Sequence, residues 1–174
     1  MNGVVASLHR RQLLVAAAAA GLLLPVIAAR AQTGPQPELP KEELVIVTHH
    51  GTGGAADTRH VFHVEMAVTA AQQEIGLMNR PQVPADGGML FDWGKPQESR
   101  MWMRNTLASL DMLFINADGT IHSIAEHTVP QSLAIIDSRG PVRATLELAA
   151  GTAERLDIRV GDTVLQRIFG NAPN

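Results

Sequence analysis

The segment 100–106, RMWMRNT, sets two arginines and a tryptophan at alternate positions. In a strand, alternate side chains point to the same face, so Arg100, Trp102 and Arg104 would stand together. A tryptophan ring offers a flat apolar surface, and guanidinium groups bind carboxylates or phosphates through paired hydrogen bonds. With Asn105 and Thr106 adding directional hydrogen bonds, the segment predicts a shallow site for a sugar or a small organic anion.

The same spacing also fits a strand that binds no ligand. Met101 and Met103 would then fill the core, because flexible thioether side chains pack into irregular gaps. The arginine stems would stack on the exposed Trp102 ring as cation–π pairs. Arg80, in the sequence GLMNR at 76–80, is a third candidate contact for an anion, or a partner for a buried acid.

Two acidic residues interrupt apolar runs, Asp111 in LDMLFI and Glu147 in LELAAG. A buried carboxylate is costly unless it is paired, so we expect each to have a partner. For Asp111 the candidates are Arg104, Arg80 and the amides of Asn105 and Thr106. One interpretation makes both acids structural, and Asp111 would then fix the 105–110 loop. The other is a glycan-acting hydrolase in which Asp111 and Glu147 face one cleft as acid and base.

Methionine and histidine raise a third possibility, which is copper handling. Thioethers favour Cu(I) and imidazole suits Cu(II), so Met101, Met103, His49 and His50 are candidate ligands. The alternative is that the methionines are core residues and the histidines are solvated. We expect no cofactor, and the absence of cysteine excludes disulfides and thiolate sites.

Residues 1–31 have the pattern of a targeting segment. Arg10 and Arg11 precede the apolar run 13–29, and Ala29-Arg30-Ala31 matches a small-x-small cleavage site. We expect a signal peptide whose removal leaves Gln32 first, with an uncleaved anchor as the alternative. The arginine pair fits a twin-arginine signal as well as an ordinary one. The protein is therefore expected to be periplasmic or secreted, with no membrane contact after cleavage.

Charge bears on the kind of partner. The whole chain has a formal net charge of −3. Residues 1–31 hold three arginines and no acid, so the mature chain would carry −6. A mildly acidic chain argues against nucleic acid or an anionic membrane surface as the partner. A small polar ligand or an unknown protein partner fits better.

The rest of the chain divides into a flexible proline-rich linker at 32–42, one domain at 43–170 and a short tail at 171–174. Strands are expected at 44–48, 60–68, 87–93, 100–105, 111–116, 120–127, 143–149 and 160–169. In 60–68 the alternation places Phe62, Val64, Met66 and Val68 inward. The turn 117–119 predicts a hairpin, and 151–158 is expected to form one or two helical turns.

One longer helix interrupts the strands. Thr69-x-x-Gln72 fits a capping box, and the residues that follow Thr69 are good helix formers. The helix is expected to stop near Asn79, and Gly76 would let it approach a strand closely. Strands separated by short turns, with one helix, predict a mainly β (α+β) fold. We expect a compact β-sandwich or barrel-like domain with one packed helix and short helical turns.

Several segments in order resemble the domain of unknown function 192 family (DUF192). They are GLMNR (76–80), GGMLFDW (87–93), WMRNTLASLDMLFI (102–115), DGTI (118–121), LELAAG (146–151) and VGD (160–162). The family pattern has proline in the middle of the connection where this chain reads Leu107-Ala108-Ser109. The resemblance covers roughly 60–168, and it implies a compact, mainly β, often exported domain without an established reaction.

The predicted function is that of an exported, monomeric binding or accessory module for a small molecule. The predicted ligand site comprises Arg80, Trp102, Arg104, Asn105, Thr106, Asp111 and Glu147. A glycan hydrolase, a copper-handling protein and a structural domain that acts through a protein partner are the alternatives.

Overall fold

The computed structural model describes residues 34–49 and 56–172. The predicted signal peptide and His50 lie outside these ranges. The described part is mainly β, as predicted. Its strands are β1 (Lys41–Thr48), β2 (Thr58–Ala67), β3 (Gly87–Met101), β4 (Leu110–Ile115), β5 (Ile121–Ala125), β6 (Ile136–Ala149) and β7 (Thr163–Leu165). Its helices are α1 (Ala70–Ile75), α2 (Thr152–Arg155) and the 3-10 turn η1 (Arg167–Phe169). No helix in the described ranges is long and apolar enough to cross a membrane.

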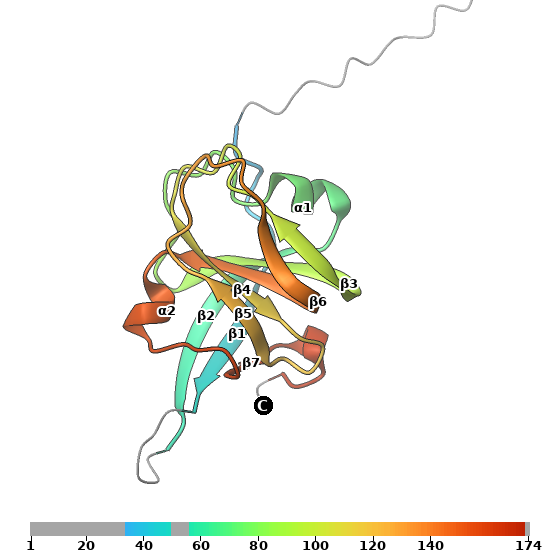
Figure 1. Cartoon of the computed structure of the whole chain (residues 1–174), viewed down its shortest axis with the longest axis vertical. Coiled ribbons are helices and arrows are strands. Elements are labelled where there is room, and N and C mark those ends of the chain that lie inside the picture. The colour runs from blue at the N-terminus through green and yellow to red at the C-terminus, as the bar shows by residue number, and fades with distance from the viewer. Residues whose placement is uncertain (1–33, 50–55, 173–174) are drawn as a thin grey trace, which may run out of the picture. The chain divides into compact units, whose positions relative to one another are not determined.

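The seven strands form one curled sheet in the order β5-β4-β6-β3-β2-β1-β7 (Figure 1). β2 and β3 are parallel, and the chain passes through α1 between them. β1 lies between β2 and β7, so strands from the two ends of the described chain are neighbours. A bridge between Thr120 and Thr163 joins the two edges of the sheet at one end. The predicted barrel-like β fold is confirmed in this form.

Both faces of the sheet are covered, which explains why β4 is buried at all six positions. Alternation in β4 sends Leu113 and Ile115 into one apolar cluster, which includes Phe62 and Leu146. Met112 and Phe114 point the other way, into a second cluster. That second cluster also contains Leu77, which follows α1, and Met103, which follows β3. The candidate site described below lies on this second face.

The helix start was predicted correctly. Thr69 caps α1: its hydroxyl accepts a hydrogen bond from the Gln72 amide, and the Gln72 side chain accepts one from the Thr69 amide. The helix ends at Ile75, earlier than expected, because Gly76 turns the backbone to a φ of +50°. A Cβ at Gly76 would lie 2.9 Å from the Phe91 ring, so glycine permits the close approach to β3.

The alternation in β2 was correct for Phe62, Val64 and Met66, which are buried, and wrong for Val68. β2 ends at Ala67, so Val68 lies beyond the sheet and is exposed. Glu65, assigned to the outer face, is 4% exposed because that face is also covered. The predicted hairpin at 117–119 is confirmed by the antiparallel pairing of β4 with β5.

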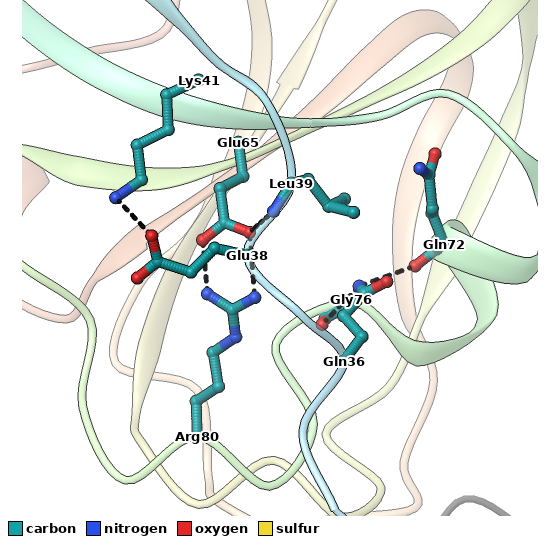
Figure 2. A network of polar contacts seen from close by, with 8 residues as sticks. All are labelled: Gln36, Glu38, Leu39, Lys41, Glu65, Gln72, Gly76 and Arg80. Atoms are coloured by element: carbon teal, nitrogen blue, oxygen red, sulfur yellow. Dashed lines mark hydrogen bonds and ion pairs between the residues drawn. The ribbon is translucent and has the colours of Figure 1, made fainter.

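The segment before β1 differs from the flexible linker predicted at 32–42. β1 already begins at Lys41. Gln36 is 7% exposed and donates hydrogen bonds to the carbonyls of Gln72 and Gly76 (Figure 2). The Leu39 amide donates to Glu65 at 2.7 Å. The proline content suggested a free chain, but these long-range hydrogen bonds hold residues 36–40, the N-terminal strap, against the sheet.

Candidate functional site

Glu147 stands in the middle of the sheet's second face. Directly paired residues on neighbouring strands form a single row across this face, in the order Lys41, Glu65, Met89, Glu147 and Met112. Met89 and Met112, on either side of Glu147, are fully buried. The side chains on either side of Glu147 in this row are therefore thioethers, which cannot donate a hydrogen bond.

Glu147 is 4% exposed, and no described residue donates a hydrogen bond to its carboxyl group. Burial raises the pKa of Glu147 to about 8, because removal from water disfavours the charged form. The carboxyl group is thus mainly protonated at neutral pH. The sequence prediction that this acid would be paired is wrong for the described residues.

The Glu147 side chain lines a cavity of about 190 Å³, the Glu147 cavity. Its aromatic walls are Phe91, Trp93 and Trp102, of which the first two stack with ring centroids 5.7 Å apart. Further lining comes from Gln73, Glu74, Ile75, Gly76, Leu77, Met78, Arg100, Met101 and Thr106. The cavity lies between the C-terminal end of α1 and the end of β3, so residues far apart in sequence meet around one carboxyl group.

The 100–106 segment is not the regular strand that its alternation predicted. β3 ends at Met101, and Arg104 and Asn105 form a turn in which Asn105 has a φ of +55°. Hydrogen bonds fix the turn, because the Met103 amide donates to Ser132 and the Thr106 amide donates back to Met103. The contact with Ser132 could not be predicted from residues 100–106, because Ser132 lies outside that segment.

This turn divides the predicted ligand site. Trp102 (38% exposed) and Thr106 line the Glu147 cavity, but Arg104 and Asn105 do not. Arg104 stacks on Trp102 with its guanidinium carbon 4.0 Å from the ring centroid, which confirms the predicted cation–π contact. Asn105 is exposed and directs its amide to the Met78 sulfur. Met103 is a core residue, as the structural alternative expected.

Asp111 lies on the opposite face of the sheet from Glu147. Asp111 on β4 pairs with Leu148 on β6, and the side chain of Leu148 belongs to the first apolar cluster. Its carboxylate accepts hydrogen bonds from the amides of His127 at 3.0 Å and Ala153 at 2.9 Å. The partners predicted for Asp111 were therefore wrong. So was the hydrolase pair, because adjacent residues of β6 face opposite ways and the two carboxyl groups cannot share a cleft.

Asp111 supplies the cap that α2 lacks. The helix begins after Gly151, which has no side chain to accept the first amides, and Asp111 accepts from Ala153 instead. Replacing Asp111 with Asn should lower the free energy of unfolding by about 1–3 kcal/mol, because one of two charge-assisted acceptors becomes a donor. Urea unfolding would measure this, with the exposed Asp86→Asn as the control. Equal stability of the two variants would contradict the capping role.

Arg80 does not reach the Glu147 cavity. Both of its terminal nitrogens bind the carboxylate of Glu65, and the Nη2–Oε2 distance is 2.9 Å (Figure 2). The Arg80–Glu65 pair lines a separate, larger cavity of about 600 Å³ beside the N-terminal strap. His63 and Asp86 also line this cavity. Glu65 was missed as a site residue because simple alternation assigned it to solvent. Its position opposite Met89 becomes visible only once β2 and β3 pair in parallel.

Of the copper candidates, the three that the structure describes share no common site. His49 contacts Asp57 and Thr163 near β7, whereas Met103 is buried in the second cluster. Met101 lines the Glu147 cavity. Within the described ranges, no three His, Cys, Asp or Glu side chains are grouped as metal ligands.

Comparisons with known proteins point to one family. The model of DUF192, described as Uncharacterized ACR, matches residues 52–166. A structure from Sinorhizobium meliloti, described as a candidate transcription regulator, is 46% identical with a TM-score of 0.71, and the match covers 76% of this chain and 98% of that one. A protein of unknown function from Novosphingobium aromaticivorans is 35% identical with a TM-score of 0.67, covering 79% and 94%. No curated protein matches.

Proposed function

Because the chain belongs to the DUF192 family, which is described as uncharacterised, we propose a function from its geometry: it binds a small polar molecule in the Glu147 cavity. The observation that carries this proposal is the unpartnered carboxyl group at 4% exposure, which faces a cavity. The Glu147 oxygens have no donor among the described residues and are reached from the cavity, so they can bond only to water or to a ligand there. A ligand with a matching polar group would use this position.

The lining of the cavity favours an uncharged or cationic ligand over the organic anion predicted from the arginines. Arg80 is occupied by Glu65, and Arg104 lies on Trp102 outside the cavity lining. Arg100 is the one lining arginine among the described residues, and it lies 3.9 Å from Asp137. The cavity is smaller than the roughly 300–1,000 Å³ of sites for drug-sized ligands, so the ligand, or the part of it that enters, is small.

The proposal includes export to the periplasm or the cell exterior. It rests on the signal-like sequence at 1–31 alone. A role in transcription, suggested by the description of the Sinorhizobium meliloti protein, gains no support from the negative net charge of this chain.

Tryptophan fluorescence tests the proposed binding. Trp93→Phe leaves Trp102, at the cavity wall, as the sole tryptophan. This variant would be titrated with glucose, glycerol, n-butanol, n-butylammonium, butyrate and phosphate. We expect a saturable change with at least one neutral or cationic compound. It should be lost when Glu147→Leu is added, because leucine keeps the bulk and removes the hydrogen bond.

The exposed glutamate of β3, in the variant Glu98→Gln, serves as the matched control and should leave the titration unchanged. The proposed function fails if no compound saturates. It also fails if only butyrate or phosphate does, or if Glu147→Leu leaves the titration intact.

A further inference from the structure

We propose that the ligand is a small organic monocation with an N–H donor, a primary or secondary ammonium, which pairs with the carboxylate of Glu147. This inference rests on the proposed function and names the chemical class of its ligand. It is drawn from three features of the Glu147 cavity: the missing donor, the aromatic and thioether walls, and the balance of charges.

The missing donor comes first. A carboxylate stabilised inside a protein normally accepts hydrogen bonds or pairs with a cation. Glu65, on the same row of the sheet, shows the satisfied arrangement: it accepts from Arg80 and from the Leu39 amide. Glu147, two strands away, is equally buried and has neither among the described residues. A bound ammonium group would supply both the positive charge and the N–H donor.

The walls of the cavity suit a cation with an apolar body. The faces of tryptophan and phenylalanine rings carry negative charge density that attracts cations. Phe91, Trp93 and Trp102 line the cavity with the thioethers of Met78 and Met101. Trp102 already holds the guanidinium of Arg104 at 4.0 Å. A bare metal ion would leave most of the 190 Å³ empty, whereas an alkylammonium would fill it.

When Glu147 is ionised, the charges around the cavity balance only with a cation present. The ionisable lining residues are Glu74 on α1, Arg100 on β3 and Glu147 on β6. When Glu147 is ionised, these sum to one net negative charge. Among the neighbouring residues, Met89 and Met112 add no charge, and the Asp92–Arg143 ion pair is internally neutral. Asp137 beside Arg100 and Arg104 on Trp102 add one charge of each sign, so the net charge is unchanged. A monocation brings the occupied cavity to neutrality, and an anion would double its negative charge.

Binding of this kind exchanges a proton. Burial raises the pKa of Glu147 to about 8, so at neutral pH the site holds a carboxyl group. Binding of an ammonium ion forms the carboxylate–ammonium pair and releases the carboxyl proton to solvent. Because the proton competes with the ligand, the affinity should rise about fiftyfold from pH 6 to pH 8. An aliphatic ammonium stays charged throughout this range.

Isothermal titration calorimetry of the full chain tests the inference with n-butylammonium, n-butanol, tetramethylammonium and butyrate. We expect n-butylammonium to bind more tightly than n-butanol at pH 8, and tetramethylammonium, which has no N–H, to bind less tightly than n-butylammonium. Near pH 6, n-butylammonium should release nearly one proton for each ligand bound. That number is measured by comparing heats in phosphate and Tris, which differ in ionisation enthalpy.

The variant Glu147→Gln keeps the shape of the side chain and cannot ionise. Glu147→Gln should lower the affinity for n-butylammonium at least tenfold at pH 8. It should also abolish the pH dependence of binding and the proton release. Glu98→Gln should leave all three unchanged. If n-butanol binds as well as n-butylammonium and the affinity does not vary with pH, the ligand class is overturned and the proposed binding function stands. If none of the four compounds binds, and the fluorescence titration also fails, both are overturned.

Discussion

Replacing Glu147 with Gln is expected to stabilise the protein by about 4 kcal/mol at pH 8 and by much less at pH 4.5. Burial raises the pKa of Glu147 from 4.5 to about 8 in the folded chain. Between these two pH values the folded chain keeps a proton that the unfolded chain loses. The stability of the unsubstituted protein therefore falls as the pH rises through this window, and glutamine removes that loss.

The measurement is the free energy of unfolding in urea at pH 4.5, 6 and 8 for the unsubstituted protein and Glu147→Gln, with Glu98→Gln as the control. Hydrogen bonds from Arg167 lower the pKa of Glu42, and those from Thr120 lower the pKa of Asp118. These groups add an opposite pH dependence, but both proteins share it, so the difference between them isolates Glu147. Parallel stability curves would show that Glu147 is hydrated or paired in solution.

Replacing Arg80 with Ala is expected to lower the free energy of unfolding by about 3–5 kcal/mol. The substitution removes both guanidinium hydrogen bonds from Glu65 and leaves its carboxylate buried with only the Leu39 amide. The exposed fractions of the Arg80 and Glu65 side chains are 15% and 5%, so the ion pair is largely withdrawn from bulk solvent.

Urea unfolding at pH 7 would measure the loss, with the exposed Arg59→Ala on the same strand as Glu65 as the control. The double variant Arg80→Ala, Glu65→Gln should recover part of the stability, since the buried group is then neutral. A double variant less stable than Arg80→Ala alone would refute the view that an uncompensated charge causes the loss.

The sequence predicted best where local chemistry decides the structure. The capping box at Thr69 depends on residues within one helical turn, and the structure forms it as expected. The β4–β5 hairpin depends on the short turn at 117–119 and on apolar residues close by. Phe62, Val64 and Met66 were assigned inward because strand alternation is regular over a few residues.

Prediction from the sequence failed where pairing between distant strands decides which side chains meet. Glu65 and Glu147 belong to one row only because β2, β3 and β6 adopt their particular registers. Asp111 and Glu147 were grouped because both are acids in apolar runs, but register places them on opposite faces. Trp102 was assigned to a regular strand, and the contact between Met103 and Ser132 ends that strand.

The pairing of β1 with β7 has a consequence for biosynthesis. Val45 pairs with Leu165, so β1 needs a segment far along the chain to complete its hydrogen bonds. A ribosome makes the chain in order, and contacts between distant residues form slowly because a long loop must close first. β1 therefore waits with one edge open until residues 163–165 have been synthesised. A nascent chain stalled before Thr163 would expose that edge to other strands, which makes truncations before Thr163 prone to aggregation.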